Sequence, residues 1–74
     1  MVRTIDIKNG AQVEKINQLA CDTPYEVWLN CGNVLLDAKS LLGLFALVGK
    51  RANVVVDDDV DPKRFGRLVH QMAV

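Results

Sequence analysis

The sequence predicts an α+β fold, an open-faced sandwich in which one four-stranded, mostly antiparallel sheet carries three helices on a single face. Hydrophobic periodicity gives the element order β-α-β-β-α-β-α. A length of 74 residues leaves room for one small core. Four short strands and three helices are too few for two packed sheets. The whole chain, residues 1–74, is therefore expected to form one domain.

A strand and a helix are predicted first. Residues 3–8 alternate between apolar and polar side chains, so that Ile5 and Ile7 face one side of a half-buried strand. Apolar residues then recur at intervals of three and four, which predicts a helix over about residues 11–21. Asp22-Thr23-Pro24 should end this helix.

The middle of the chain has the pattern of a local hairpin. Residues 25–31 alternate and are rich in β-branched and aromatic side chains, and residues 34–37 supply a second strand after the turn Gly32-Asn33. Alternation places Trp28 opposite Val27 and Leu29. We therefore favour a role for Trp28 in packing on the sheet face, with a ligand platform as the alternative.

A short helix is predicted to begin after Ser40. This serine suits the N-cap position, where its hydroxyl can accept a hydrogen bond from an amide in the first turn. The helix has two apolar faces, of which only one can turn inward. One face consists of Leu44, Leu47 and Val48, and the other of Leu41, Leu42 and Phe45. The second set is predicted to stay exposed beside Ser40 as a protein-binding surface.

The last third of the chain contains a strand, an acidic run and a helix. Gly49 suits a left-handed helix end, and residues 53–56 form the fourth predicted strand. The acidic residues between 57 and 61 lack the ligand spacing of a calcium loop. Asp61-Pro62 suits the start of a helix instead, so no metal site is predicted. The apolar stripe of this helix is Phe65, Leu68, Val69 and Met72.

Charge and composition exclude several classes of function. Nine basic and nine acidic residues give a net charge of zero, which argues against nucleic acid as a partner. No apolar run approaches the length of a membrane span, and the first residues lack an apolar export signal, so a soluble cytoplasmic protein is expected. Cys21 and Cys31 are interpreted as inert, buried or half-buried thiols, with metal, redox or disulfide roles as the alternatives.

One segment resembles a known family. Ala38–Leu47, preceded by the strand residues Glu26–Leu29, is similar to the regulatory-serine region of HPr, the histidine phosphocarrier of the bacterial sugar phosphotransferase system. The predicted element order also matches the HPr fold. The resemblance implies protein partners, among them HPr kinase/phosphorylase or a regulator, and phosphorylation at Ser40.

The resemblance breaks at the family's active-site histidine. Residues 10–16 contain no histidine, and Gln12 falls at its position, as in the catabolite-repression paralogue of HPr. The amide of Gln12 is not a nucleophile at neutral pH, and Glu14 would repel a phosphate. The only histidine, His70, is expected to face solvent on the last helix. Phosphocarrier activity is therefore predicted to be absent.

Three hypotheses for function follow from these patterns. The leading one is an HPr-like regulatory or protein-binding module with phosphorylation at Ser40 as its switch; a plain helix cap is the alternative role of that serine. The second is a phosphotransfer component that uses another residue. The third is a structural or self-associating domain. No catalytic constellation or cofactor site is visible, so the chain is not expected to be an enzyme, and we expect a monomer or weak dimer.

Overall fold

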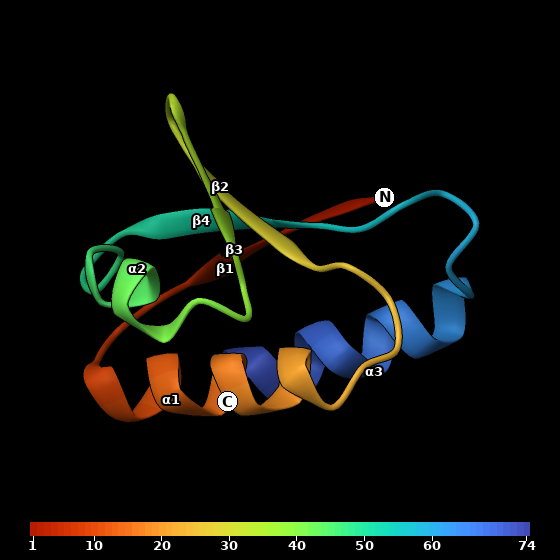
Figure 1. Ribbon diagram of the computed structural model, residues 1–74, viewed down its shortest axis with the longest axis horizontal. Helices are drawn as coiled ribbons and strands as arrows, with labels where there is room; N and C mark the ends of the chain where they lie inside the picture. Colours follow the sequence, from red (N-terminus) through yellow and green to blue (C-terminus); the bar gives the residue numbers. More distant parts are fainter.

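The computed structural model describes residues 1–74, with the seven elements in the predicted order (Figure 1). The elements are β1 (Val2–Asp6), α1 (Gly10–Cys21), β2 (Trp28–Cys31), β3 (Val34–Asp37), α2 (Leu41–Phe45), β4 (Arg51–Val55) and α3 (Pro62–Ala73). The four strands form one sheet, and every pair of neighbouring strands is antiparallel. The prediction of an α+β open-faced sandwich is confirmed.

The order of strands in the sheet is β1-β4-β2-β3, so that β4 lies in the interior although it comes last of the four strands in the sequence. Ile5 of β1 lies opposite Ala52 of β4, and Leu29 of β2 lies opposite Val54 of β4. All four side chains are buried. Because these side chains share the face turned toward the helices, this register places them in the core, where they form its sheet side.

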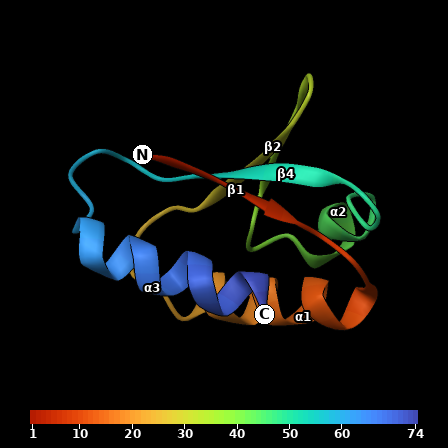
Figure 2. The same ribbon diagram turned by 180° about the vertical axis from the view of Figure 1, so that it is seen from behind.

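The helices form a second layer under the sheet. Figures 1 and 2 show α1 and α3 side by side below the strands, with α2 at one end of the molecule, next to the beginning of α1. The apolar stripes predicted for α1 and α3 are confirmed, because each contributes side chains to the core. These are Val13, Ile16 and Ala20 from α1, and Phe65, Leu68 and Met72 from α3.

Several strand boundaries differ from the predictions, and β1 begins and β4 ends one residue early. Strand β1 ends at Asp6, before the predicted end. Strand β2 starts at Trp28 instead of residue 25, because its pairing with β4 begins where Trp28 faces Val55. Strand β4 starts two residues early, at Arg51, since Arg51 already pairs with Asp6 of β1. Strand ends follow from the partner strand, which local alternation does not reveal.

Helix α2 is shorter than its apolar pattern indicates. After Phe45 the backbone amides of Ala46, Leu47 and Val48 each bond the carbonyl three residues earlier, which tightens the chain into 3₁₀-type turns. Gly49 follows with a φ of 85°, the left-handed conformation predicted for it.

None of the three helices combines the length and the apolar character that crossing a membrane requires.

Candidate functional site

Ser40 lies exposed immediately before α2, at the predicted N-cap position. The predicted capping bond is wrong, because the Ser40 side chain accepts no hydrogen bond from the first turn. The turn into the helix is built by Asp37 instead: its side-chain oxygen accepts from the Lys39 amide at 2.9 Å, and its carbonyl accepts from the Ser40 amide at 2.9 Å. The Ser40 hydroxyl is therefore not needed to start the helix.

The exposed side of α2 is apolar. Leu42 is 87% exposed, while Leu41, Phe45 and Val48 are between 36% and 41% exposed. Together these four side chains are called the α2 surface below. They account for half of the eight large apolar side chains that the protein leaves exposed. The predicted exposure of Leu41, Leu42 and Phe45 is confirmed.

One residue of this segment, Val48, lies on the other face from the one predicted. Leu44 and Leu47 are buried as predicted, but Val48, which was grouped with them, is exposed. The reason lies in the 3₁₀-type bonds after Phe45, because residues three apart in such a turn are eclipsed. Val48 therefore lines up with the exposed Phe45 and extends the α2 surface.

The α2 surface and the segment before it are anchored to α1. A β-carbon at Gly10 would lie only 3.2 Å from Phe45 Cε1, so the phenylalanine ring packs against the first residue of α1. The Asn17 side chain of α1 donates a hydrogen bond of 3.1 Å to the Ala38 carbonyl, just before Ser40. These contacts fix the segment that carries Ser40 relative to α1.

Gln12, the residue at the expected position of the family histidine, points into the protein. It occupies the third residue of α1 and is only 8% exposed. Its backbone amide donates to the side chain of Asn9, the N-cap, at 2.9 Å, and its Oε1 accepts from the Lys8 amide at 2.8 Å. This is a variant of the capping box, in which the side chain reaches one residue farther back than usual.

The amide nitrogen of Gln12 connects two further elements. Nε2 donates to the Asp6 carbonyl of β1 at 2.8 Å and to the Met72 carbonyl of α3 at 3.0 Å. Both ends of the side-chain amide are thus used within the protein, and the residue ties β1, α1 and α3 together. Sequence reasoning considered Gln12 only as a substitute for histidine and missed this structural role.

The other predicted chemistry-bearing residues lie apart from the α2 surface. His70 is exposed on α3, as expected. Trp28 lies half-buried on β2. Both cysteines are free thiols: Cys31 is half-buried as expected, but Cys21 is exposed, because it ends α1 on the side away from the core.

The acidic run is used for structure. Asp61 caps α3 by accepting a hydrogen bond of 3.1 Å from the Lys63 amide, as predicted. Asp58 forms an ion pair of 2.8 Å with the amino group of Met1, and the hydrogen bond and charge of that group lower the pKa of the carboxyl. No three His, Cys, Asp or Glu side chains are grouped so that they could hold a metal ion.

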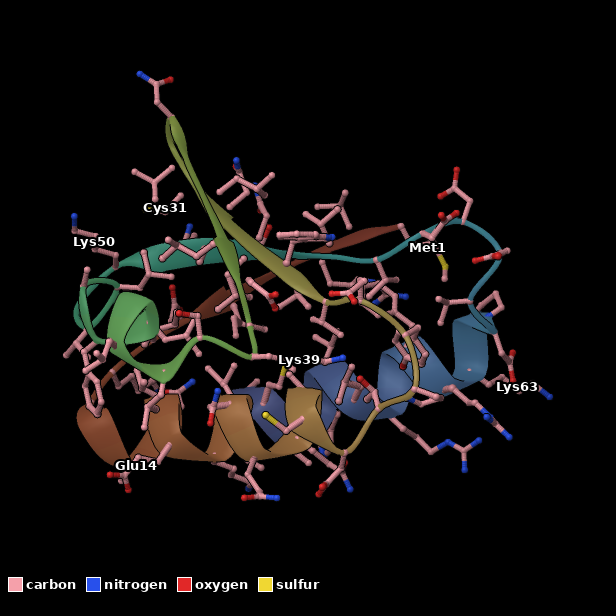
Figure 3. The ribbon with its side chains drawn as sticks, viewed as in Figure 1. Met1, Glu14, Cys31, Lys39, Lys50 and Lys63 are labelled. Carbon is pink, nitrogen blue, oxygen red and sulfur yellow. The ribbon has the colours of Figure 1, made fainter.

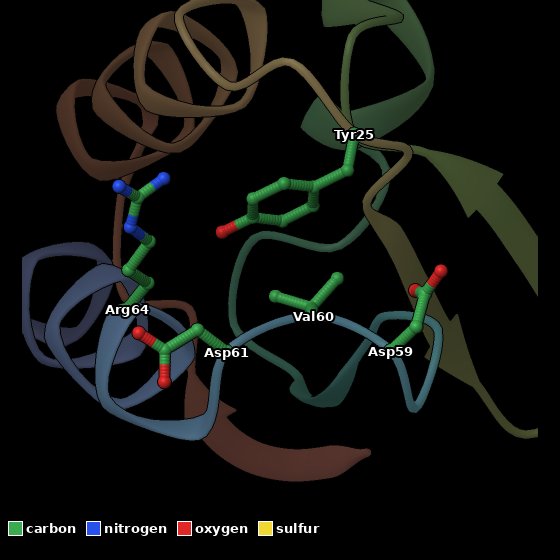
Figure 4. Close-up of a pocket in the computed structure, with 5 residues that line it drawn as sticks. All are labelled: Tyr25, Asp59, Val60, Asp61 and Arg64. Carbon is green, nitrogen blue, oxygen red and sulfur yellow. The ribbon is translucent and has the colours of Figure 1, made fainter.

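A hollow of about 470 Å³ lies between the acidic run and α3 (Figure 4). Its lining residues are Tyr25, Asp59, Val60, Asp61 and Arg64. Figure 4 shows the hydroxyl end of Tyr25 pointing toward the side where Arg64 and Asp61 lie, with Asp59 on the other side. The charges have both signs, and none of the charged side chains is buried. We therefore find no binding constellation in this hollow.

The comparisons with known proteins show a similarity of fold and no sequence match. No protein-family model matches the sequence, and no curated protein matches it. Among solved structures, the chain is similar to the crystal structure of HPr-C-His from Thermoanaerobacter tengcongensis, with a TM-score of 0.76 and 22% sequence identity. The similarity covers 97% of this chain and 90% of that chain. The chain therefore has the HPr fold.

Proposed function

We propose that this protein is a protein-binding regulatory module related to the HPr family of the bacterial sugar phosphotransferase system, and that it acts without phosphocarrier chemistry. The observation that carries the proposal is the α2 surface, which gathers half of the large exposed apolar side chains beside an exposed serine. The HPr fold supplies the context, and the resemblance of the sequence to HPr implies protein partners. The module needs no cofactor and catalyses no reaction of its own.

Burial of the α2 surface would supply the favourable free energy of partner binding. Full burial of one leucine or phenylalanine side chain contributes about 1.5–3 kcal/mol. Leu42 is almost completely exposed in the free protein, so a partner could bury nearly all of it. Phe45 is already held against Gly10, and its ordering would cost little entropy on binding. These two residues are the expected centre of the interface.

Phosphorylation of Ser40 would act on this surface as a switch. The serine is exposed, its hydroxyl is not used to cap the helix, and Leu41 and Leu42 follow it directly. A phosphate adds between about 1.5 and 2 negative charges at neutral pH. Such a charge beside an apolar interface disfavours one partner through desolvation and favours another that offers arginine side chains. The fold itself would remain, since no bond of the Ser40 hydroxyl holds the helix start.

The proposed loss of carrier activity is supported by the position of Gln12. Its side-chain amide cannot attack a phosphoryl group at neutral pH and is held by three hydrogen bonds inside the protein. His70 is the only imidazole, and it lies on the exposed side of α3. Incubation with phosphoenolpyruvate and enzyme I should therefore add no acid-labile phosphate. If such a phosphate appears, the chain is a carrier that uses another residue.

Intact mass spectrometry tests the proposed switch. We expect incubation with ATP and HPr kinase/phosphorylase to add one phosphate to the parent protein and none to Ser40→Ala. If both proteins keep their original mass, this kinase does not act on Ser40. If both gain a phosphate, the modified residue is a different one.

Paired leucine variants test the surface itself. Leu42→Asp places a charge on the α2 surface, whereas Leu35→Asp places the same charge on β3, where the leucine is 58% exposed. Both residues are on the outside, so both variants should fold. We expect Leu42→Asp to weaken binding of an isolated partner at least tenfold and Leu35→Asp to change it less than twofold. Equal effects of the two substitutions would refute the assignment of the interface.

A further inference from the structure

The outward face of α3 carries a stripe of basic side chains that the proposed function does not use. Lys63, Arg67 and His70 line a surface hollow of about 540 Å³ together with Gly66 and Gln71. No acidic residue lines this hollow, and α3 contains none. Figure 3 shows Lys63 extending away from the body of the molecule. These five residues are called the α3 stripe below.

The cations of the α3 stripe have no partner within the protein. The two ion pairs of the structure join Met1 with Asp58 and Arg51 with Asp6, and neither involves α3. Lys63 and Arg67 lie one helical turn apart and repel each other, and neither forms an ion pair within the fold. The stripe therefore has an unmatched positive potential that an acidic group from outside can neutralise.

Gly66 lies in the middle of this stripe, although glycine destabilises the interior of a helix. A β-carbon added at this position would have no atom within 4 Å, so core packing does not demand a glycine. What the glycine provides is open space between Lys63, one turn before it, and His70, one turn after it. A ligand atom can approach the helix backbone at this point more closely than any side chain would allow.

We propose that the α3 stripe binds a short acidic segment of a partner protein, with Gly66 as the point of closest approach. From residue 63 to residue 70 the helix rises by about 10 Å, which equals the length of about three extended residues or two helical turns. Two or three carboxylates at that spacing match Lys63, Arg67 and His70. Arginine adds the possibility of a bidentate bond to one of them.

The surroundings of the stripe favour a short acidic peptide over a nucleic acid strand. The loop directly before α3 carries four aspartates, at positions 57, 58, 59 and 61. A long phosphate backbone that continued past Lys63 would come within a Debye length, about 8–10 Å, of these carboxylates. The stripe also lacks an aromatic side chain on which a base could stack. A segment no longer than the stripe meets these carboxylates only at its Lys63 end and is repelled less than a long strand.

The α3 stripe and the α2 surface lie in different parts of the molecule. Helix α1 contacts both α2 and α3, and Figures 1 and 2 show α2 at one end while α3 runs along the far side of α1. This inference is therefore independent of the proposed function, and either one can fail alone.

The test uses a blocked tetraglutamate peptide as probe and amide chemical shifts of the ¹⁵N-labelled protein as readout, at low and high salt. We expect shifts confined to residues 63–71 that weaken as salt is raised. Lys63→Gln combined with Arg67→Gln should lower the affinity about tenfold, since each exposed ion pair contributes up to about fivefold. The control, Arg3→Gln with Lys50→Gln, removes one arginine and one lysine elsewhere and should change the affinity less than twofold.

Gly66→Gln separates binding from folding. Glutamine is a better helix former than glycine, so the variant should melt at a higher temperature. Its side chain fills the open space, so the peptide affinity should fall about threefold. The proposal is overturned if no shifts appear on α3, or if the control pair matters as much as the α3 pair. It is equally overturned if a thymidine oligonucleotide of equal charge binds more tightly, or if the α3 shifts arise from self-association with rising protein concentration.

Discussion

Replacing Gln12 by alanine removes three side-chain hydrogen bonds, to the Lys8 amide and to the carbonyls of Asp6 and Met72. Each contributes a net 0.5–1.5 kcal/mol, so we expect the free energy of unfolding to fall by about 3 kcal/mol. The higher helix propensity of alanine offsets only a few tenths of a kcal/mol of this loss. For a domain of this size, whose total stability is about 4–11 kcal/mol, the loss corresponds to a melting temperature lower by about 15 °C.

Urea unfolding followed by circular dichroism measures this loss. The control is Gln18→Ala, the same substitution on the same helix, at an exposed residue whose side chain bonds only Asp22, at 3.2 and 3.3 Å. The control should cost less than about 0.5 kcal/mol. A second variant, Gln12→Glu, can still accept from Lys8, but a carboxylate cannot donate to the two carbonyls, so it should be at least as unstable as Gln12→Ala.

A result within 1 kcal/mol of the Gln18→Ala control would refute the reasoning. It would mean that the hydrogen bonds of Gln12 are replaced by water, or that they contribute too little to join the three elements. A stable Gln12→Glu variant would show in addition that the side chain is not held against the Asp6 and Met72 carbonyls.

Three further predictions concern a helix cap, a left-handed glycine and an ion pair. Asp61→Ala should lower the free energy of unfolding by about 1 kcal/mol in urea titrations, because it removes the N-cap of α3. Gly49→Ala should cost about 1–2 kcal/mol by the same assay, since alanine is strained at a φ of 85°. The lowered pKa of Asp58 means that its stabilising contribution is present above the unfolded-state value and is lost as pH falls through the folded-state value. Asp58→Asn should therefore flatten the acid limb of the stability profile. Asp59→Asn, which removes a neighbouring carboxylate outside this ion pair, is the matched control.

The fold could be predicted largely from the sequence because its core follows simple periodicities. The stripe of α3 and the inward faces of the strands are each specified by residues close together in the chain. The strand ends were less predictable, since Arg51 and Trp28 become strand residues through partners far away in the sequence. Local patterns contain no information about those partners.

The candidate surface could be predicted in part for the same reason. The exposure of Leu41, Leu42 and Phe45 follows from helical spacing. The exposure of Val48 could not be predicted, because it depends on the change to 3₁₀-type hydrogen bonds after Phe45. The Ser40 hydroxyl makes no capping bond, because Asp37 accepts the hydrogen bonds that form the turn before the helix. The role of Gln12 was hidden because one of its acceptors, the Met72 carbonyl, lies 60 residues away. Only the Asn9-to-Gln12 spacing of a capping box signalled it.

The interior position of β4 has a consequence for the order in which the chain can fold. Both β1 and the β2–β3 hairpin pair with β4, and they do not pair with each other. Val2–Asp6 is synthesised almost fifty residues before its partner Arg51–Val55. Until then only the hairpin and isolated helices can form, and the exposed edges of β1 and β2 have no strand to join. Completion of the sheet therefore waits for β4 and requires closure of the long loop between β1 and β4.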